Sequence, residues 1–162
     1  MTHGYNPIKT MSRKASDNKY LHKDFHLSMN LLMEYIYKNF GKDKLIDYLK
    51  QYTMAYHKPL YEQIQSGNIE ALASSLRDLY EKEEWPIKIT QEEDRIVIEQ
   101  HACPGISHIK SKGEKPISLY VETYKTVYTT LCENTPFEYE LVFFDDETGA
   151  CIQLFKRKEK LK

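Results

Sequence analysis

The chain has 162 residues, which is the size of a single domain. Its 23 Lys and Arg residues nearly balance its 24 Asp and Glu residues, and no basic stripe runs along it, so we expect no nucleic-acid partner. No apolar run is long enough for a signal peptide or a membrane span, so we expect no membrane partner and a cytoplasmic location. The three cysteines match no zinc-finger or thioredoxin spacing and are expected to be reduced thiols.

The sequence divides into an arm and one domain. Residues 1–16 show no apolar period, so we expect a flexible N-terminal arm. Residues 17–162 are expected to form a single α+β domain, with a helical part over residues 17–84 and a sheet part over residues 85–156.

Glycine and proline divide the helical part into segments. Asp17 or Asn18 can cap a first helix, which ends at Gly41. Apolar residues recur in it at three- and four-residue steps, as one face of an α-helix requires, at Leu21, Phe25, Met29, Leu32, Ile36 and Phe40. The following helices are expected over residues 42–57, 59–66 and 69–84.

After residue 84 the apolar period becomes alternating, which is typical of strands. Strands are expected over residues 87–89, 95–101, 137–144 and 150–156, with a loop over 102–117 and a helix over 118–133. Helices segregated from an antiparallel sheet define an α+β fold. We therefore expect N-terminal helices packed on a four-stranded antiparallel sheet that is built of two hairpins around one helix.

Tyrosine is abundant, with thirteen residues in the chain. A tyrosine ring packs against apolar neighbours while its hydroxyl stays hydrogen-bonded or in water. We favour a half-buried belt of tyrosines on the helices. The alternatives are a pocket wall or an interface.

The segment from His101 to His108 is the richest in chemistry. Cys103 follows a predicted strand, and Pro104 and Gly105 let the chain turn so that backbone N–H groups can point at an anion. His101 shares a strand face with Cys103 if the strand geometry persists, and His108 can fold back toward the thiol. A thiol near an imidazole can become a nucleophilic thiolate.

Two other interpretations of this segment stay open. His26, Cys103 and His108 can together supply three ligands and leave an open position, as catalytic zinc prefers, which makes zinc the candidate cofactor. Alternatively, Cys103 is a small buried residue in a structural turn flanked by two surface histidines.

Two further candidates lie on predicted helices. His22 and His26 are neighbours on one face of the first helix, but the acidic residue of an HExxH-type metal site is missing. His26 lies at the border of the apolar face, where it can face a pocket or make one structural hydrogen bond. Glu122 lies early in the helix after the Cys103 segment, where the helix dipole favours a carboxylate; it can also orient His108 or act as an acid or base.

Short motifs in a fixed order carry a family resemblance. A strand runs into Cys103-Pro104, a helix follows a glycine-containing loop, and the last hairpin reads Glu147-Thr148-Gly149-Ala150-Cys151, while Asp24-Phe25-His26 stands near the N-terminus. In these features the chain resembles the proteins grouped with L-2-amino-thiazoline-4-carboxylic acid hydrolase. The topology also resembles the wider fold of the 4-vinyl reductase domain and the transport-particle subunits, which hold a ligand site between their layers. The resemblance implies that Cys103 is the thiol to test in the ring-opening hydrolysis of a cyclic amidine-like substrate.

These observations predict a small-molecule-binding protein, or a hydrolase that acts on a cyclic amidine-like or C–N bond substrate through a Cys/His site. The alternative is a non-enzymatic ligand-sensing module, or a homodimer formed through tyrosine-rich helices. The candidate catalytic residues are Cys103, His108, His26 and Glu122, and the candidate ligand contacts are His101 and Gly105.

Overall fold

The computed structural model describes residues 22–159, with side chains from residue 25 onward. The predicted arm over residues 1–16 and the predicted caps Asp17 and Asn18 lie outside this part of the chain. The helices are α1 (His22–Tyr56), α2 (Lys58–Gln65), α3 (Ile69–Lys82), α4 (Pro104–Ser111) and α5 (Glu122–Cys132). The strands are β1 (Lys88–Gln91), β2 (Arg95–Gln100), β3 (Phe137–Phe144) and β4 (Cys151–Arg157).

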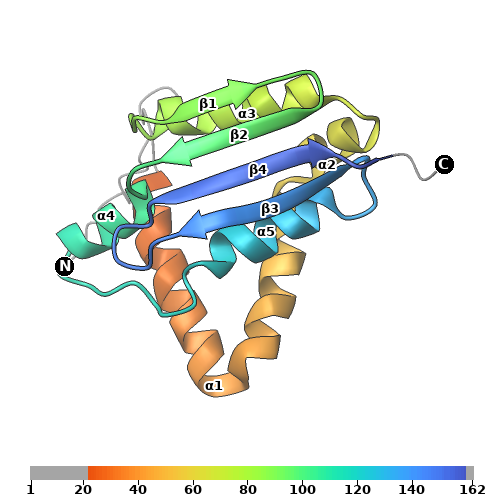
Figure 1. Ribbon diagram of the computed structural model, residues 1–162. Coiled ribbons are helices and arrows are strands. Elements are labelled where there is room, and N and C mark those ends of the chain that lie inside the picture. The colour runs from red at the N-terminus through yellow and green to blue at the C-terminus, as the bar shows by residue number, and fades with distance from the viewer. Residues whose placement is uncertain (1–21, 160–162) are drawn as a thin grey trace, which may run out of the picture.

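The strands form one antiparallel sheet in the order β1-β2-β4-β3, and the predicted α+β fold is confirmed (Figure 1). β1 with β2 and β3 with β4 are the two predicted hairpins. β2 and β4 join them through pairs such as Ile98 with Gln153 and Gln100 with Cys151. This register brings the end of β2, which leads to Cys103, beside the start of β4.

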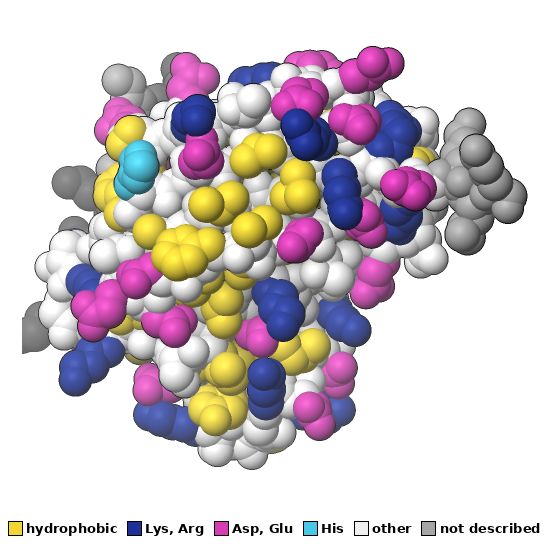
Figure 2. All heavy atoms as spheres, viewed as in Figure 1, with side chains coloured by type: hydrophobic (Ala, Val, Ile, Leu, Met, Phe, Trp, Pro, Cys, Tyr) yellow, Lys and Arg dark blue, Asp and Glu magenta, His cyan; other side chains and the backbone are white. Residues whose placement is uncertain are grey.

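The helices cover one face of the sheet and leave the other open (Figure 1). Alternate residues of β2 and β4 point into the covered face and are buried there: Ile96, Ile98, Gln100, Cys151, Gln153 and Phe155. On the open face, Val142, Phe143 and Ile152 are 53, 50 and 37% exposed. Figure 2 shows hydrophobic side chains gathered over the strands on this open face.

Helix α1 is a V of two helical segments rather than one rod (Figure 1). Gly41 lies between them with φ 85° and ψ 176°, a non-helical conformation that is open to glycine and disfavoured for other residues. The predicted end of the first helix at Gly41 therefore corresponds to this break. Met33 and Leu45 from the two segments are fully buried in one core cluster with Ile106 and Ile109 of α4.

The predicted loop over residues 102–117 is wrong in its first part, because Pro104 to Ser111 form α4. Cys103 is the N-cap: its backbone is extended, and its Sγ accepts a hydrogen bond from the Ile106 N–H. Pro104 suits the first helical position, where no N–H partner is needed. Pro104 and Gly105, which were expected to form a turn, are therefore the first two residues of a capped helix.

The next helix also begins later than predicted. Residues 118–121 form turns closed by i,i+3 hydrogen bonds, including Glu122 N–H to the Leu119 carbonyl at 3.0 Å, and α5 starts at Glu122. Within residues 22–159, no helix is both long and apolar enough to cross a membrane.

Candidate functional site

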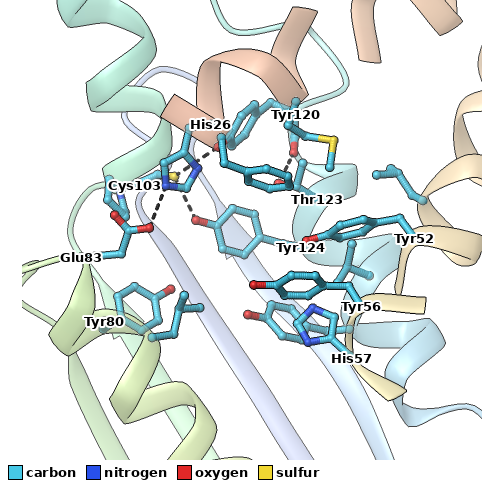
Figure 3. Close-up of a pocket in the computed structure, with 17 residues that line it drawn as sticks. His26, Tyr52, Tyr56, His57, Tyr80, Glu83, Cys103, Tyr120, Thr123 and Tyr124 are labelled. Carbon is cyan, nitrogen blue, oxygen red and sulfur yellow. Dashed lines mark hydrogen bonds and ion pairs between the residues drawn. The ribbon is translucent and has the colours of Figure 1, made fainter. Parts of the chain in front are cut away.

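A cavity of about 140 Å³ lies where α1, the end of α3, the start of α4 and α5 meet (Figure 3). Its wall is mostly aromatic and aliphatic. The lining residues are Phe25, His26, Met29, Leu49, Tyr52, Tyr56, His57, Leu79, Tyr80, Glu83, Cys103, Pro104, Tyr120, Thr123, Tyr124, Val127 and Tyr128.

Tyrosines make up much of this wall. Six of the thirteen tyrosines line the cavity: Tyr52, Tyr56, Tyr80, Tyr120, Tyr124 and Tyr128. The Tyr52 and Tyr56 rings stack with centroids 5.4 Å apart, and Figure 3 shows the hydroxyls of Tyr52, Tyr56 and Tyr124 pointing into the hollow. Helical spacing produces this arrangement, since residues four apart share one helix face. The tyrosines are thus more than a half-buried belt, because they form a pocket wall.

Cys103 lines the cavity and is 2% exposed. Its Sγ accepts hydrogen bonds from the Tyr124 hydroxyl at 3.0 Å and from the Ile106 N–H at 3.5 Å. Its own N–H donates to the Thr148 carbonyl at 2.8 Å, which ties the start of α4 to the β3–β4 turn. The thiol is therefore held in one place by three elements.

A buried amide fixes the direction of the Tyr124 hydroxyl. Gln100 Nε2 donates to Tyr124 Oη at 3.1 Å and to the Gly149 carbonyl at 2.8 Å, and Gln100 Oε1 accepts from the Tyr80 hydroxyl at 2.6 Å. Because Tyr124 Oη already accepts from Gln100, its proton is free to be donated to Cys103 Sγ.

Burial raises the pKa of the Cys103 thiol, and the hydrogen bond from Tyr124 offsets part of that rise. Burial also raises the pKa values of Cys132 and Cys151, each to about 12. All three cysteines are free and buried. Cys103 is therefore a neutral thiol near pH 7, and it lacks the lowered pKa that an activated nucleophile would show.

His26 and Glu83 form the polar edge of the cavity (Figure 3). His26 Nε2 lies 2.8 Å from Glu83 Oε1, and Glu83 is only 3% exposed. Gly105 backs this pair: a Cβ at that position would lie 2.7 Å from His26 Nδ1 and would collide with the Tyr120 hydroxyl. Gly105 is thus needed for close packing of α4 against the histidine.

Three predicted site residues lie outside the cavity. His101 is exposed in a bend, because β2 ends at Gln100 and the strand geometry does not persist. His108 lines a separate surface hollow with Trp85, since α4 carries it away from the thiol. Glu122 accepts a hydrogen bond from Thr126 Oγ1 at 2.6 Å within its own helix.

The structure brings together His26, Cys103 and Gly105 from the predicted set, and their predicted roles stay predictions. The side chain of His22 lies outside the described part of the chain. Among the described side chains, no group of three or more His, Cys, Asp or Glu residues could hold a metal ion. The predicted zinc set of His26, Cys103 and His108 therefore does not converge.

Glu83 was not predicted from the sequence, and a tyrosine-lined pocket wall was only the less favoured alternative. Glu83 lies at the end of α3 among charged neighbours, a pattern typical of a solvated helix end. Its partner His26 is 57 residues away, and no local pattern reports such a pairing. The helical spacing of Tyr52, Tyr56, Tyr120 and Tyr124 was the one signal available for the wall.

No protein-family model matches the sequence, and no curated protein matches it significantly. The resemblance to the proteins grouped with L-2-amino-thiazoline-4-carboxylic acid hydrolase therefore stays a prediction.

Proposed function

We propose that this protein binds a small, largely apolar molecule in the tyrosine-lined cavity. The observation that carries the proposal is the cavity itself, whose aromatic wall has one polar edge formed by His26, Glu83 and Cys103. Pockets of this composition, apolar with a few polar groups that fix orientation, are typical of ligand sites.

The volume limits the size of the ligand. An apolar cavity of about 150 Å³ is known to take a benzene molecule. At about 140 Å³, this cavity has room for a single ring. A small substituent would extend toward solvent, because Tyr56 in the wall is 58% exposed.

The test uses three single-ring probes of similar shape and different charge: benzamidine, benzamide and benzoate. Amide chemical shifts of the ¹⁵N-labelled chain are recorded during titration with each probe. We expect at least one probe to shift signals of residues around the cavity. The same probe should still shift the signals of these residues in the control variant Val97→Phe, and it should no longer shift them in Val127→Phe.

The two variants add the same ring in different places. Val127 is buried in the cavity wall, so phenylalanine there fills the hollow, while Val97 is half-buried on the open sheet face. An unchanged response in Val127→Phe, or no response to any probe in the parent chain, would contradict the proposal.

A hydrolase is the second candidate, because Cys103 and His26 line the same cavity. In that reaction Cys103 Sγ would add to the carbon of a cyclic amidine-like group. The ring C–N bond would break as the nitrogen took up a proton, and water would then release the product from sulfur. The raised pKa of the thiol counts against this reaction in the unliganded protein. Turnover of such a substrate that disappears in Cys103→Ser would favour the hydrolase over simple binding.

A homodimeric interaction module is favoured by one separate observation, the exposed side chains Val142, Phe143 and Ile152 on the open sheet face. Apolar residues grouped in this way often mark interaction sites. Sedimentation equilibrium of the parent chain and of Val142→Lys distinguishes a dimer through this face from a monomer. A cytoplasmic location also stays a prediction, and three free thiols are compatible with it.

A further inference from the structure

A second hollow borders the cavity and points to the shape of the ligand, an inference that rests on the binding function proposed above. This groove runs between α2 and α3 and has a volume of about 860 Å³. Tyr56, His57 and Leu79 line both the cavity and the groove. Tyr56 is exposed, so the cavity wall reaches solvent at this border. The groove therefore begins where the cavity opens.

The border lies on a defined side of the cavity. Figure 3 shows Tyr56 and His57 on the side away from Cys103. The Tyr56 ring stacks on the Tyr52 ring with centroids 5.4 Å apart and meets the His57 ring edge-on at 5.0 Å. These contacts hold the Tyr56 ring in place at the border. A ring that fills the cavity beside Cys103 can therefore direct a substituent past Tyr56.

The groove has a half-buried floor of mixed character. Leu60 of α2 lies on one side, and Ala71, Ser75 and Leu79 of α3 lie on the other. The three α3 residues are four apart in sequence, so they share one face of the helix. Because alanine and serine are small, the space between the two helices stays open beside them. The floor can thus contact both the methylene and the polar groups of an extended chain.

The charges along the groove favour neither sign. Asp78 and Lys82 are exposed and lie one helical turn apart on the same side of α3. Glu70, the other acidic residue of the groove, is bound by Arg77 at 3.2 Å and by Gln91 at 2.7 Å. Exposed charges of this kind add little to binding, because water screens them. The groove is therefore suited to an uncharged chain.

We propose that the ligand is a ring that carries an unbranched chain with amide or hydroxyl groups. The ring fills the cavity, and the chain passes between Tyr56 and Leu79 into the groove. Its methylene groups pack on Leu60 and Leu79, while its polar groups meet the polar rim and water. Such a molecule buries more apolar surface than the ring alone, and part of that gain is offset by the ordering of the chain.

The experiment compares two ring probes with forms that are longer by one glycine unit. Benzamide is paired with hippuramide and benzoate with hippurate, so the ring and the net charge stay the same within each pair. Calorimetry at one pH and one ionic strength measures the four affinities. We expect the longer form to bind about fivefold tighter than the shorter form in at least one pair. Equal or weaker binding of the longer form in both pairs would overturn the inference and leave the binding function standing.

A pair of variants locates the chain. Ser75→Leu fills the floor of the groove and should reduce the advantage of the longer form to less than about twofold, while the shorter form binds as before. Ser111→Leu is the matched control, because it makes the same change at the exposed last residue of α4, outside both hollows. It should leave the advantage unchanged.

The remaining outcomes separate this inference from the binding function. An advantage of the longer form that persists in Ser75→Leu, or that is lost equally in Ser111→Leu, would overturn the inference. Failure of all four molecules to bind would also overturn it. In that case a response to benzamidine in the titration described above would leave the binding function standing, and no response to benzamidine would overturn both.

Discussion

At Cys103, two opposed effects act on one thiol. Burial removes the sulfur from water and raises its pKa, while donors from Tyr124 and the start of α4 stabilise the thiolate and lower it. Burial has the larger effect, so the resting group is a neutral thiol. A positively charged ligand bound in the cavity would lower the pKa of the Cys103 thiol and so favour the thiolate.

Removing the Tyr124 donor should raise the pKa of Cys103 further. In Tyr124→Phe the thiolate loses a hydrogen bond of the charged kind, so the pH–rate profile of iodoacetamide alkylation should move to higher pH. The rate at a fixed pH below the midpoint should then fall about tenfold. The measurement is made in a variant that also carries Cys132→Ser and Cys151→Ser, so that Cys103 is the only thiol that can be alkylated.

Tyr128→Phe is the control for this prediction. It removes a hydroxyl from the same wall that makes no bond to the sulfur, and it should leave the profile in place. If the pH–rate profile of alkylation is unchanged in Tyr124→Phe, or moves to lower pH, the Tyr124 hydroxyl does not stabilise the thiolate.

Individual residues of the site were predictable to different degrees. Cys103 and His26 were identified because a thiol at a strand end and a histidine at the edge of an apolar helix face stand out in a sequence. His108 and His101 were assigned to the same site because a loop and a continuing strand were assumed, and α4 and the bend after β2 place both elsewhere. Glu83 depends on a long-range pairing that no local pattern contains.

Among the elements, α1 and the segment between α4 and α5 are joined by one buried amide. Asn30 is 2% exposed; its Nδ2 donates to the Lys115 carbonyl at 3.0 Å, and its Oδ1 accepts from the Ile117 N–H at 2.9 Å. This pair of bonds satisfies backbone groups of a connection that has no regular structure of its own. It holds α1 against the segment that leads to Tyr120.

Asn30→Ala should lower the free energy of unfolding by about 1 to 3 kcal/mol, because the buried Ile117 N–H and the part-buried Lys115 carbonyl lose their partner. Urea unfolding measures the loss. Asn39→Ala removes an exposed amide that bonds only to the Tyr35 carbonyl one turn earlier in α1, and it should change stability by less than about 0.5 kcal/mol. Equal losses in the two variants would mean that the Asn30 bridge adds no stability.

The strands were the most predictable elements, since their alternating pattern persists over several residues. The predicted strand over residues 137–144 matches β3 residue for residue. Turn-forming residues were less informative: Pro104 after Cys103 begins a helix, and Ser118 precedes turns rather than capping α5. A short helix of eight residues offers too few periods to be recognised from its apolar residues alone.

At the scale of the whole molecule, the fold has a helical layer, a sheet layer and a ligand-sized hollow among its helices. The V of α1 contributes Phe25 and His26 from one arm and Tyr52 and Tyr56 from the other. α5 completes the wall from below the sheet (Figure 1). The α+β class could be predicted from the order of helical and strand patterns in the sequence. The cavity could not be predicted, because its walls come from segments up to about a hundred residues apart.

The most direct test of the central claim is a crystal structure of the chain grown with the tightest-binding of the three ring probes. We predict electron density for one ring among Tyr52, Tyr80 and Tyr124, with its polar substituent directed toward the exposed Tyr56. Density at any other position, or an unchanged cavity under conditions where calorimetry shows binding, would contradict the account.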